Sequence, residues 1–369
     1  MIKCASEADV VEAVRDAHGP FEILGAGTKR GFGRAPEGEG LDLSGVSGIV
    51  SYEPDEMILT AKPGTKVSEI EAVLAEKNQC LGFDPPDWGP LFGSPASQGT
   101  IGGAIACDVA GSAAIRYGRA RDHLLGFRAV NGLGEAYRGG GKVVKNVTGF
   151  DLPKLMCGSF GTLGPLTEVT LRVFPEAPLS ATLAVTEVTT EAGLALLRRV
   201  RSSPLEATGL AYMPGEAVAI IRVDGAREPL AEKLALLREL LSEHEAYEVD
   251  GGDALFGELG GGAPLLGSGL AVWRIAVPRA QAVALAKEIA APLWYADWAG
   301  GLIWAGTKVT DVHERAAKHG GHAILLRADD KAIAPFAPEP PARAALTKSV
   351  KAAFDPSGLF NPGRMWDGV

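Results

Sequence analysis

The spacing of hydrophobic and polar residues predicts alternating helices and strands along the first half of the chain. Val10 and Val14 share one face of a helix over 6–19, and the apolar run 21–24 is typical of a strand. Ser6 and Asp9 stand at the spacing of a capping box, which marks the start of that helix. Two short strands around a Pro-Asp turn are predicted within 48–64, and a helix over 66–80 with Ser68 and Glu71 at the same capping-box spacing. Further strands are predicted at 126–130, 142–147 and 165–175.

The pattern changes after Pro175 and Pro178, where helical and strand periods alternate without a glycine-rich turn. This alternation is typical of an α+β layer that covers another part of a protein. The Pro-rich run 334–343 indicates a linker, so we expect domains at 1–176, 177–333 and 334–369. The elements predicted here are strands near 181–188, 217–223, 270–277 and 322–327, helices near 189–201, 228–244 and 279–291, and a last helix near 340–354.

The composition is that of a globular protein with an unusual demand for glycine. Of 369 residues, 46% are hydrophobic, 22% are charged and 48 are glycine. The net charge of −9 argues against nucleic acid or an anionic membrane surface as partner, because both would repel the protein. The cysteines Cys4, Cys80, Cys107 and Cys157 are scattered, so we expect free thiols in a reducing compartment and no metal or iron–sulfur site.

The sequence contains no segment with the pattern of a signal peptide or of a membrane span. Residues 1–16 carry charges where a signal peptide needs an apolar core. The least charged stretch, 254–273, contains Glu258 and several glycines. We therefore expect a cytoplasmic protein, one that reaches the inner membrane only at its periphery and through a complex.

A glycine-rich turn follows the first predicted strand, in the sequence FEILGAGTKRGFGR (21–34). A nicotinamide-binding Rossmann unit needs G-x-G-x-x-G leading directly into a helix. Position 30 is Arg, and further glycines and a proline follow, so a helix would be costly there. Two interpretations remain: a surface turn, or an anion nest in which backbone N–H groups, Thr28 and Lys29 hold a diphosphate.

Two further glycine-rich segments favour the anion nest. Residues 99–111 place Gly102 and Gly103 among small residues, and residues 146–164 contain four more glycines, including Gly149. Glycine lets a backbone approach a flat ring or a phosphate closely, because no Cβ stands between them. Three such loops in one domain indicate a large cofactor held along its length.

The motifs GAGTKRGFG (25–33), TIGGAIACDVAGSAAIRYGRARDHLLG (100–126), KNVTGFDLPKLMCGSFGTLG (145–164) and FDPSGLFNPGRM (354–365) together resemble the vanillyl-alcohol-oxidase-like (PCMH-type) flavoproteins. Within that family they are most similar to the FAD-binding subunits of bacterial glycolate oxidases. The resemblance implies an α+β fold: a two-subdomain PCMH-type FAD-binding domain, then an α+β cap, with a C-terminal segment that returns to the flavin. It also implies a larger flavin subunit and an iron–sulfur subunit as partners, and a small 2-hydroxy acid as substrate.

The same resemblance assigns residues to the cofactor FAD. The first loop would hold the pyrophosphate, and Asn361 would lie at the isoalloxazine ring. Relatives with covalent flavin often use a His from these loops, whereas the first loop here offers Lys29 and Arg30, so we expect non-covalent FAD. The residues assigned are Gly25, Ala26, Gly27, Thr28, Lys29, Thr100, Gly102, Gly103, Ala106, Gly111, Tyr117, Gly118, Asp122, Gly161, Gly164, Thr167 and Asn361.

The cap is expected to supply the groups that bind and deprotonate a 2-hydroxy acid. Larger relatives carry an HxGDGNxH-like stretch, often with a metal, and the equivalent place here is KHGGHAILLR (318–327). His319 and His322 are present but the Asp and Asn are absent, so we expect no metal. The two histidines are either catalytic, or a helix-end cap and a packed ring. Arg274 and Arg327 are candidates for binding a carboxylate, the alternative being solvated or ion-paired strand residues.

Four aromatic residues, Trp294, Tyr295, Trp298 and Trp304, lie close together in the sequence. We expect them in the core of a sheet, with a cover over the flavin or a partner interface as alternatives. Three functions stay open at this stage. The chain is an FAD-binding glycolate oxidase subunit that passes electrons to an iron–sulfur partner, a flavin-containing scaffold or relay without its own substrate chemistry, or an interaction protein without flavin.

Overall fold

The computed structural model describes residues 1–142 and 150–369, and their contacts divide the chain into two units. The first unit comprises Met1–Ala110, Gly118–Pro175 and Pro338–Val369. The second unit comprises Gly111–Tyr117 and Glu176–Ala337. Most of the strand predicted at 142–147 and the predicted loop residue Gly149 lie outside the described residues.

Two sheets form the framework of the first unit. One is parallel, with the strand order β1-β3-β2, and the other is antiparallel, with the order β4-β5-β9-β7-β8. A short pair, β6-β10, accompanies them. The strands are β1 (Ile2–Lys3), β2 (Phe21–Leu24), β3 (Glu39–Asp42), β4 (Ile49–Glu53), β5 (Ile58–Ala61), β6 (Gln79–Cys80), β7 (Leu124–Val130), β8 (Ala136–Gly140), β9 (Leu166–Arg172) and β10 (Phe174–Pro175).

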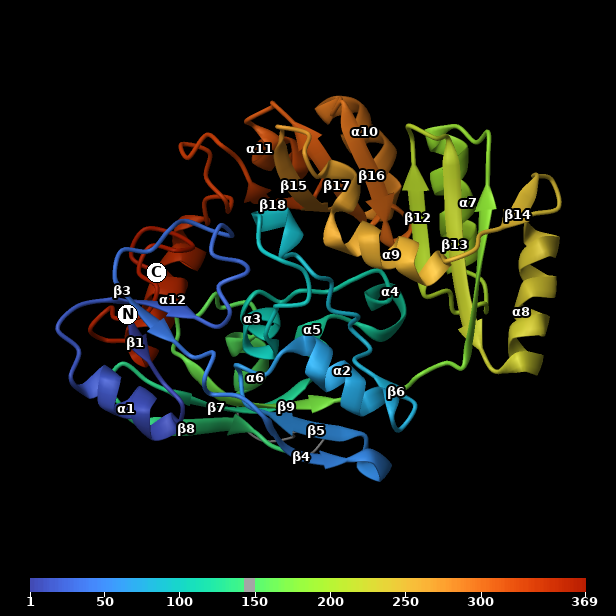
Figure 1. The fold of residues 1–369 in the computed structure, drawn as a ribbon. Coiled ribbons are helices and arrows are strands. Elements are labelled where there is room, and N and C mark those ends of the chain that lie inside the picture. Colours follow the sequence, from blue (N-terminus) through green and yellow to red (C-terminus); the bar gives the residue numbers. More distant parts are fainter. Residues whose placement is uncertain (143–149) are drawn as a thin grey trace. The chain divides into compact units, whose positions relative to one another are not determined.

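Short helices cover one face of the five-stranded sheet (Figure 1). Ile70 and Leu74 of α2 and Ile105 of α3 pack in one buried cluster with Leu59 and Val169 of the sheet. Apolar side chains at helical spacing therefore face strand residues that alternate in and out of the core. The helices of this unit are α1 (Glu7–Arg15), α2 (Val67–Ala75), α3 (Ile101–Ala106), α5 (Ala120–His123), α6 (Leu152–Met156) and α12 (Pro341–Phe354).

The capping box predicted for the first helix is confirmed, and the one predicted for the second helix is wrong. Ser6 Oγ accepts from the Asp9 N–H at 3.2 Å, and Asp9 Oδ2 accepts from the Ser6 N–H at 3.0 Å. Helix α2 begins at Val67, with Lys66 instead of Ser68 as its N-cap. The Val67 N–H donates to the Gly99 carbonyl at 2.9 Å, so a tertiary contact replaces the local cap and Ser68 lies inside the first turn.

An eight-stranded antiparallel sheet forms the second unit, with the order β14-β11-β13-β12-β16-β17-β15-β18 (Figure 1). This confirms the predicted α+β layer and its four predicted strands. The strands are β11 (Leu179–Val185), β12 (Gly209–Met213), β13 (Val218–Gly225), β14 (Ala246–Glu248), β15 (Ala271–Ala276), β16 (Leu293–Asp297), β17 (Leu302–Thr307) and β18 (His322–Arg327). The helices are α4 (Ala114–Tyr117), α7 (Thr190–Arg201), α8 (Arg227–Leu240), α9 (Gly252–Gly261), α10 (Ala282–Ile289) and α11 (Val312–Lys318).

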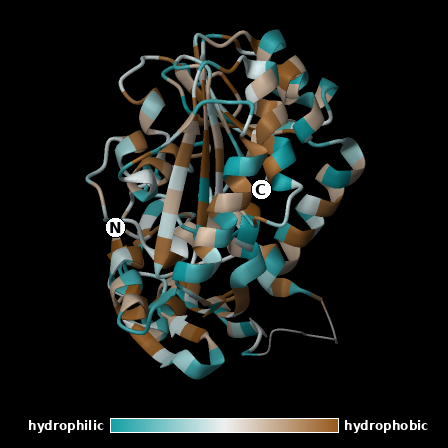
Figure 2. Ribbon diagram, turned by 90° about the vertical axis from the view of Figure 1, so that its right-hand side faces the viewer, coloured by the Kyte–Doolittle hydropathy of each residue, from teal (hydrophilic) through white to brown (hydrophobic). Residues whose placement is uncertain are grey.

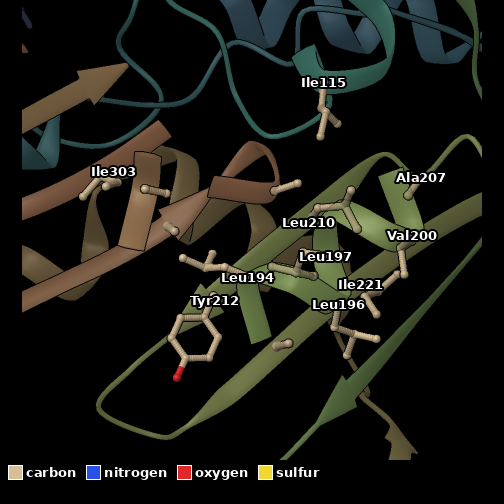
Figure 3. Close-up of a cluster of buried hydrophobic side chains, with 14 of the residues drawn as sticks. Ile115, Leu194, Leu196, Leu197, Val200, Ala207, Leu210, Tyr212, Ile221 and Ile303 are labelled. Atoms are coloured by element: carbon tan, nitrogen blue, oxygen red, sulfur yellow. The ribbon is translucent and has the colours of Figure 1, made fainter. Parts of the chain in front are cut away.

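One apolar cluster holds helices α7, α8, α10 and α11 of the second unit to its sheet. Leu194 and Leu197 of α7 pack with Leu210 of β12 and Ile221 of β13 (Figure 3). Ile115, from the separate segment Gly111–Tyr117, joins the same cluster. Hydrophobic and hydrophilic residues alternate along the helical ribbons (Figure 2), as expected for helices with one buried and one solvated side.

Candidate cofactor-binding site

An open cavity lies in the first unit, where the three glycine-rich segments meet. The structure therefore brings together loops whose wall residues are more than 50 residues apart in the sequence. The predicted cofactor residues that line the cavity are Gly25, Ala26, Gly27, Thr28, Lys29, Thr100, Gly102, Gly103, Ala106, Gly161, Gly164 and Asn361.

The other residues assigned to the cofactor do not line this cavity. Gly111 and Tyr117 belong to the second unit, where the Gly111 carbonyl accepts from Trp298 Nε1 at 3.1 Å. In the first unit, Asp122 Oδ2 accepts from the Arg119 N–H at 2.9 Å, close to Gly118. Thr167 Oγ1 donates to Glu7 Oε2 at 2.6 Å. Their contact with the cofactor stays a prediction.

Sequence reasoning missed part of the cavity wall. Arg30 argues against a Rossmann turn and against a covalent flavin, but its place in the wall was not predicted, and Arg364 stands in a motif without a predicted role. A signal for Arg364 was available, since it directly follows the Asn-Pro-Gly of the C-terminal motif. The wall residues that were not predicted are Ile23, Leu24, Arg30, Leu43, Pro63, Cys107, Ser159, Phe160, Leu166 and Arg364.

Arg30 fixes the first glycine loop to the strand that precedes it. Its Nε donates to Glu22 Oε1 at 2.9 Å and its Nη2 to Glu22 Oε2 at 2.5 Å. Glu22 is a buried residue of β2. Bidentate pairing of this kind is strong and directional. The loop therefore turns back on β2 after Gly27, which has a φ of +71°, instead of continuing into a helix.

The wall of the cavity is positively charged. Among the described residues that line it are Lys29, Arg30 and Arg364, and none is Asp or Glu. Lys29 Nζ lies 3.5 Å from Thr28 Oγ1, and it would lie 3.5 Å from a Cβ added to Gly103 of the second loop. A concave site with cations and backbone amides but no carboxylate suits an anionic group such as a diphosphate. The wall therefore fits the cofactor that the sequence motifs imply.

Glycine at 102 is required for the packing of the second loop, and its approach to the cofactor stays a prediction. A Cβ on Gly102 would lie 2.5 Å from Pro63 Cβ and 2.9 Å from the Pro63 carbonyl oxygen. The second loop can therefore pack against Pro63 only without a side chain at this position.

Asn361 joins the C-terminal segment to two other parts of the wall. Its Oδ1 accepts from the Ile23 N–H at 2.8 Å, and its Nδ2 donates to the Phe160 carbonyl at 2.7 Å. A Cβ on Gly161, which has a φ of +72°, would lie 2.7 Å from that Nδ2. The Asn361 amide thus holds β2 and the third loop in place. Its predicted contact with the isoalloxazine ring stays a prediction.

The predicted catalytic residues belong to the second unit, where they lie at the end of α11, on β18 and on β15. His319 ends α11, and its ring contacts Glu288 Oε2 at 2.7 Å and Gln281 Oε1 at 3.2 Å. His322 and Arg327 are the first and last residues of β18. Arg274 is buried on β15, with its guanidinium carbon 4.9 Å from the centre of the Trp298 ring. No cluster of metal ligands occurs among the described residues.

The aromatic residues of this unit form part of the sheet core, as predicted for Tyr295 and Trp304. Their rings stack with centroids 5.9 Å apart, and both side chains are buried. Trp294 and Trp298 are partly buried and pack against the main apolar cluster.

Asp297 is a buried carboxylate that sequence reasoning did not identify. Ser112 Oγ donates to its Oδ2 at 2.5 Å, and the Trp298 N–H donates to its Oδ1 at 2.6 Å. Burial nevertheless raises the pKa of Asp297 to about 6. The poorly solvated Asp297 carboxylate therefore joins the segment Gly111–Tyr117, through Ser112, to the rest of the second unit.

Asp297→Asn is expected to become more stable relative to the unmodified protein as the pH rises from 4 to 7. The folded protein holds the Asp297 proton up to a pKa of about 6, whereas the unfolded chain releases it near the ordinary aspartate pKa of 3.8. The unmodified protein therefore loses stability across this interval, by about 3 kcal/mol in total. Urea unfolding of both proteins at several pH values measures the difference. A difference that is constant with pH would contradict the assignment.

Comparison with known proteins supports FAD as the cofactor that the cavity wall fits. Residues 1–140 match the family model described as an FAD binding domain. Over its whole length the fold is similar to p-cresol methylhydroxylase with substrate bound, with a TM-score of 0.72, 15% identity, and coverage of 99% of this chain and 88% of the other. Alkyldihydroxyacetonephosphate synthase gives a TM-score of 0.72 at 18% identity, with coverage of 98% and 75%. The fold is therefore that of the vanillyl-alcohol-oxidase-like (PCMH-type) flavoproteins.

Relatives of higher sequence identity identify the family of this chain within that fold class. The chain is 34% identical over 350 residues to glycolate oxidase subunit GlcE of Escherichia coli (strain K12), covering 94% of this chain and 93% of the relative. It belongs to the family of that subunit. It is also 29% identical over 237 residues to glycolate oxidase subunit GlcD of Bacillus subtilis (strain 168), covering 63% of this chain and about half, 48%, of GlcD.

The family assignment confirms the resemblance that the sequence motifs indicated. A D-lactate dehydrogenase of Archaeoglobus fulgidus is 32% identical over 201 residues, covering 54% of this chain and 43% of that enzyme. The relatives are thus FAD-linked oxidoreductases of hydroxy acids. In the described part of the chain, no helix combines the length and the hydrophobicity that crossing a membrane requires.

Proposed function

We propose that this chain is the FAD-binding subunit of a 2-hydroxy acid dehydrogenase complex of the glycolate oxidase type. The first unit would be the FAD-binding domain, corresponding to residues 1–176 with the tail 334–369, and the second unit the cap domain at 177–333. The observation that carries the proposal is the cavity of three glycine loops, whose wall has Lys29, Arg30 and Arg364 and no carboxylate. The family assignment supports the same cofactor.

The cavity supports non-covalent binding of FAD. No histidine is among the described residues that line it, and Cys107 is the cysteine in its wall. Burial raises the pKa of the Cys107 thiol. A covalent bond to the flavin requires a nucleophile such as the thiolate, which burial disfavours.

In this proposal the two units have separate tasks. Bound FAD supplies an acceptor for the hydride of the substrate Cα, so that glycolate is oxidised to glyoxylate. The glycine loops with Lys29 hold the cofactor, and Arg274 is our candidate for binding the substrate carboxylate. His319, His322 and Arg327 are further candidates for proton transfer or carboxylate binding. An iron–sulfur subunit would receive the electrons, beside a larger flavin subunit, in a complex that is cytoplasmic or peripheral to the inner membrane.

The cofactor is tested directly on the purified protein. We expect a yellow protein whose flavin passes completely into solution when the protein is denatured by heat. Flavin that stays with the precipitate would contradict non-covalent binding. A colourless protein that takes up no added FAD would contradict the proposed function.

A second candidate function is an FAD-containing scaffold or electron relay without its own substrate chemistry. It is favoured by His319, because both ring nitrogens contact side chains of the protein, Glu288 and Gln281. Mixing the isolated chain with glycolate or D-lactate without oxygen distinguishes the two functions. Bleaching of the flavin band supports catalysis in this chain. Absence of bleaching, together with turnover when the partner subunits are added, supports the relay.

A further inference from the structure

Three arginines gather on the surface of the second unit, where α7 ends and α10 begins. Arg198 and Arg201 stand one turn apart at the end of α7, and Arg279 opens the 3₁₀ turn Arg279–Gln281 that leads into α10. Arg198 Nη1 donates to the Arg279 carbonyl at 3.4 Å, so the two helix ends lie side by side. We call Arg198, Arg201 and Arg279 the arginine patch.

The arginine patch is accessible and is not neutralised by the second unit itself. Arg201 and Arg279 are exposed, and Arg198 is half-buried. Among the described residues, no carboxylate forms an ion pair with any of the three. The nearby acidic residues are engaged elsewhere: Glu191 of α7 pairs with Lys287 at 2.5 Å, and Glu206 pairs with Arg116.

Helix stability explains only part of this arrangement. Arginines in the last turn of a helix interact favourably with the helix dipole, which accounts for Arg198 and Arg201. Arg279 stands at the opposite end of a helical segment, where a positive charge is unfavourable. Burial, and next the charge of Arg201, lower the pKa of Arg279. The folded chain therefore keeps like charges together at a cost that an external anion would reduce.

Hydrogen bonds to the backbone hold the arginine patch in one geometry. Arg279 Nε donates to the Trp298 carbonyl at 2.9 Å, and the Arg279 carbonyl in turn accepts from Arg198. Side chains that are already held in place lose less conformational entropy on binding. A guanidinium presents a planar fork of donors that matches a carboxylate, and arginine is enriched at protein interfaces.

We propose that the arginine patch docks an acidic surface segment, rich in Asp and Glu, of another subunit of the complex. This rests on the proposed function, in which the chain has partner subunits. An anionic membrane is the alternative occupant, but a chain with a net charge of −9 is repelled by an extended anionic surface. A short acidic segment senses mainly the charges within a Debye length, about 8–10 Å, and these are the arginines.

The test measures the affinity of the FAD-loaded chain for the purified larger flavin subunit and for the purified iron–sulfur subunit, at about 50 and 300 mM salt. We expect the triple variant Arg198→Gln, Arg201→Gln, Arg279→Gln to bind one of them about 10- to 100-fold more weakly at low salt, because each exposed charge pair contributes a factor of roughly two to five. Most of the loss should be in the association rate. High salt should weaken binding of the unmodified chain much more than binding of the variant.

The matched control is the triple variant Arg227→Gln, Arg238→Gln, Lys308→Gln, which removes the same number of positive charges from exposed positions of the same unit. Its affinity for both subunits should stay within about threefold of the unmodified value. A second variant, Arg198→Gln with Arg201→Gln, keeps the hydrogen bond of Arg279 to the Trp298 carbonyl. It should lose about 5- to 20-fold. Thermal unfolding checks that every variant is folded.

Unchanged affinity of both patch variants for the two subunits would overturn the proposal, and so would an equal loss in the control. Loss of binding to phosphatidylglycerol vesicles, with both subunits still bound normally, would also overturn it and would assign the arginine patch to a membrane. If the unmodified chain takes up FAD but binds neither subunit, the proposed complex is contradicted and the docking surface with it. A chain that takes up no FAD would contradict the proposed function at the cofactor instead.

Discussion

Replacing Lys351 by Met is expected to lower the free energy of unfolding by about 3–5 kcal/mol, the usual cost of removing one partner of a buried ion pair. Lys351 lies on α12 and is only 5% exposed. Its Nζ donates to Asp355 Oδ2 at 2.6 Å, to the Thr162 carbonyl at 2.7 Å and to the Phe360 carbonyl at 2.7 Å. One ammonium group thus joins the last helix, the third glycine loop and the tail.

The expected loss comes mainly from the partners that Lys351 would leave behind. Asp355 is also buried, and would keep only the backbone donors of Leu359 and Phe360. Met has a similar length, so the substitution removes the charge without opening a large cavity. Because the tail carries Asn361 and Arg364 into the cofactor cavity, we also expect weaker FAD binding.

Urea unfolding of the apoprotein measures the loss, and FAD titration measures the second effect. The matched control is Lys348→Met, three residues earlier on the same helix, where the side chain is exposed. We expect that control to change stability by no more than about 0.5 kcal/mol. Equal stabilities of the two variants would show that the buried ammonium does not hold the tail.

The sequence predicted what depends on local chemistry. The Ser6–Asp9 capping box, the strand β2 and the helix α7 follow from residues next to one another in the chain. The second capping box failed because a distant carbonyl, that of Gly99, engages the first turn of α2. Helix α9 was not predicted, because its sequence GDALFGELGG is rich in glycine, and packing overrides the low helix propensity there. Phe256 of that helix is fully buried against Gly209.

The candidate site was predicted in outline but not in its electrostatics. Glycine patterns located the loops, and most of the glycines assigned to the cofactor do line one cavity. The sequence could not show that Arg30 pairs with Glu22, nor that this leaves Arg364 without its own carboxylate. Both facts depend on which side chains the fold brings together. A residue type alone does not reveal whether a cation is already neutralised.

Gly102→Val is expected to abolish FAD uptake, because the new side chain would collide with the protein itself. Its Cβ would lie 2.5 Å from Pro63 Cβ and 2.9 Å from the Pro63 carbonyl oxygen, which accepts a hydrogen bond from the Gly102 N–H at 2.9 Å. Proline is too rigid to move aside, so the second loop, with Thr100 and Gly103, must shift at the cavity wall. FAD titration of the apoprotein, followed by flavin fluorescence, measures uptake.

The control is Gly99→Ala. Its Cβ would meet only Lys29 Nζ, at 3.9 Å, so this substitution should leave FAD uptake within about threefold of that of the unmodified protein. Normal uptake by Gly102→Val would mean that the second loop does not form the wall of the FAD site.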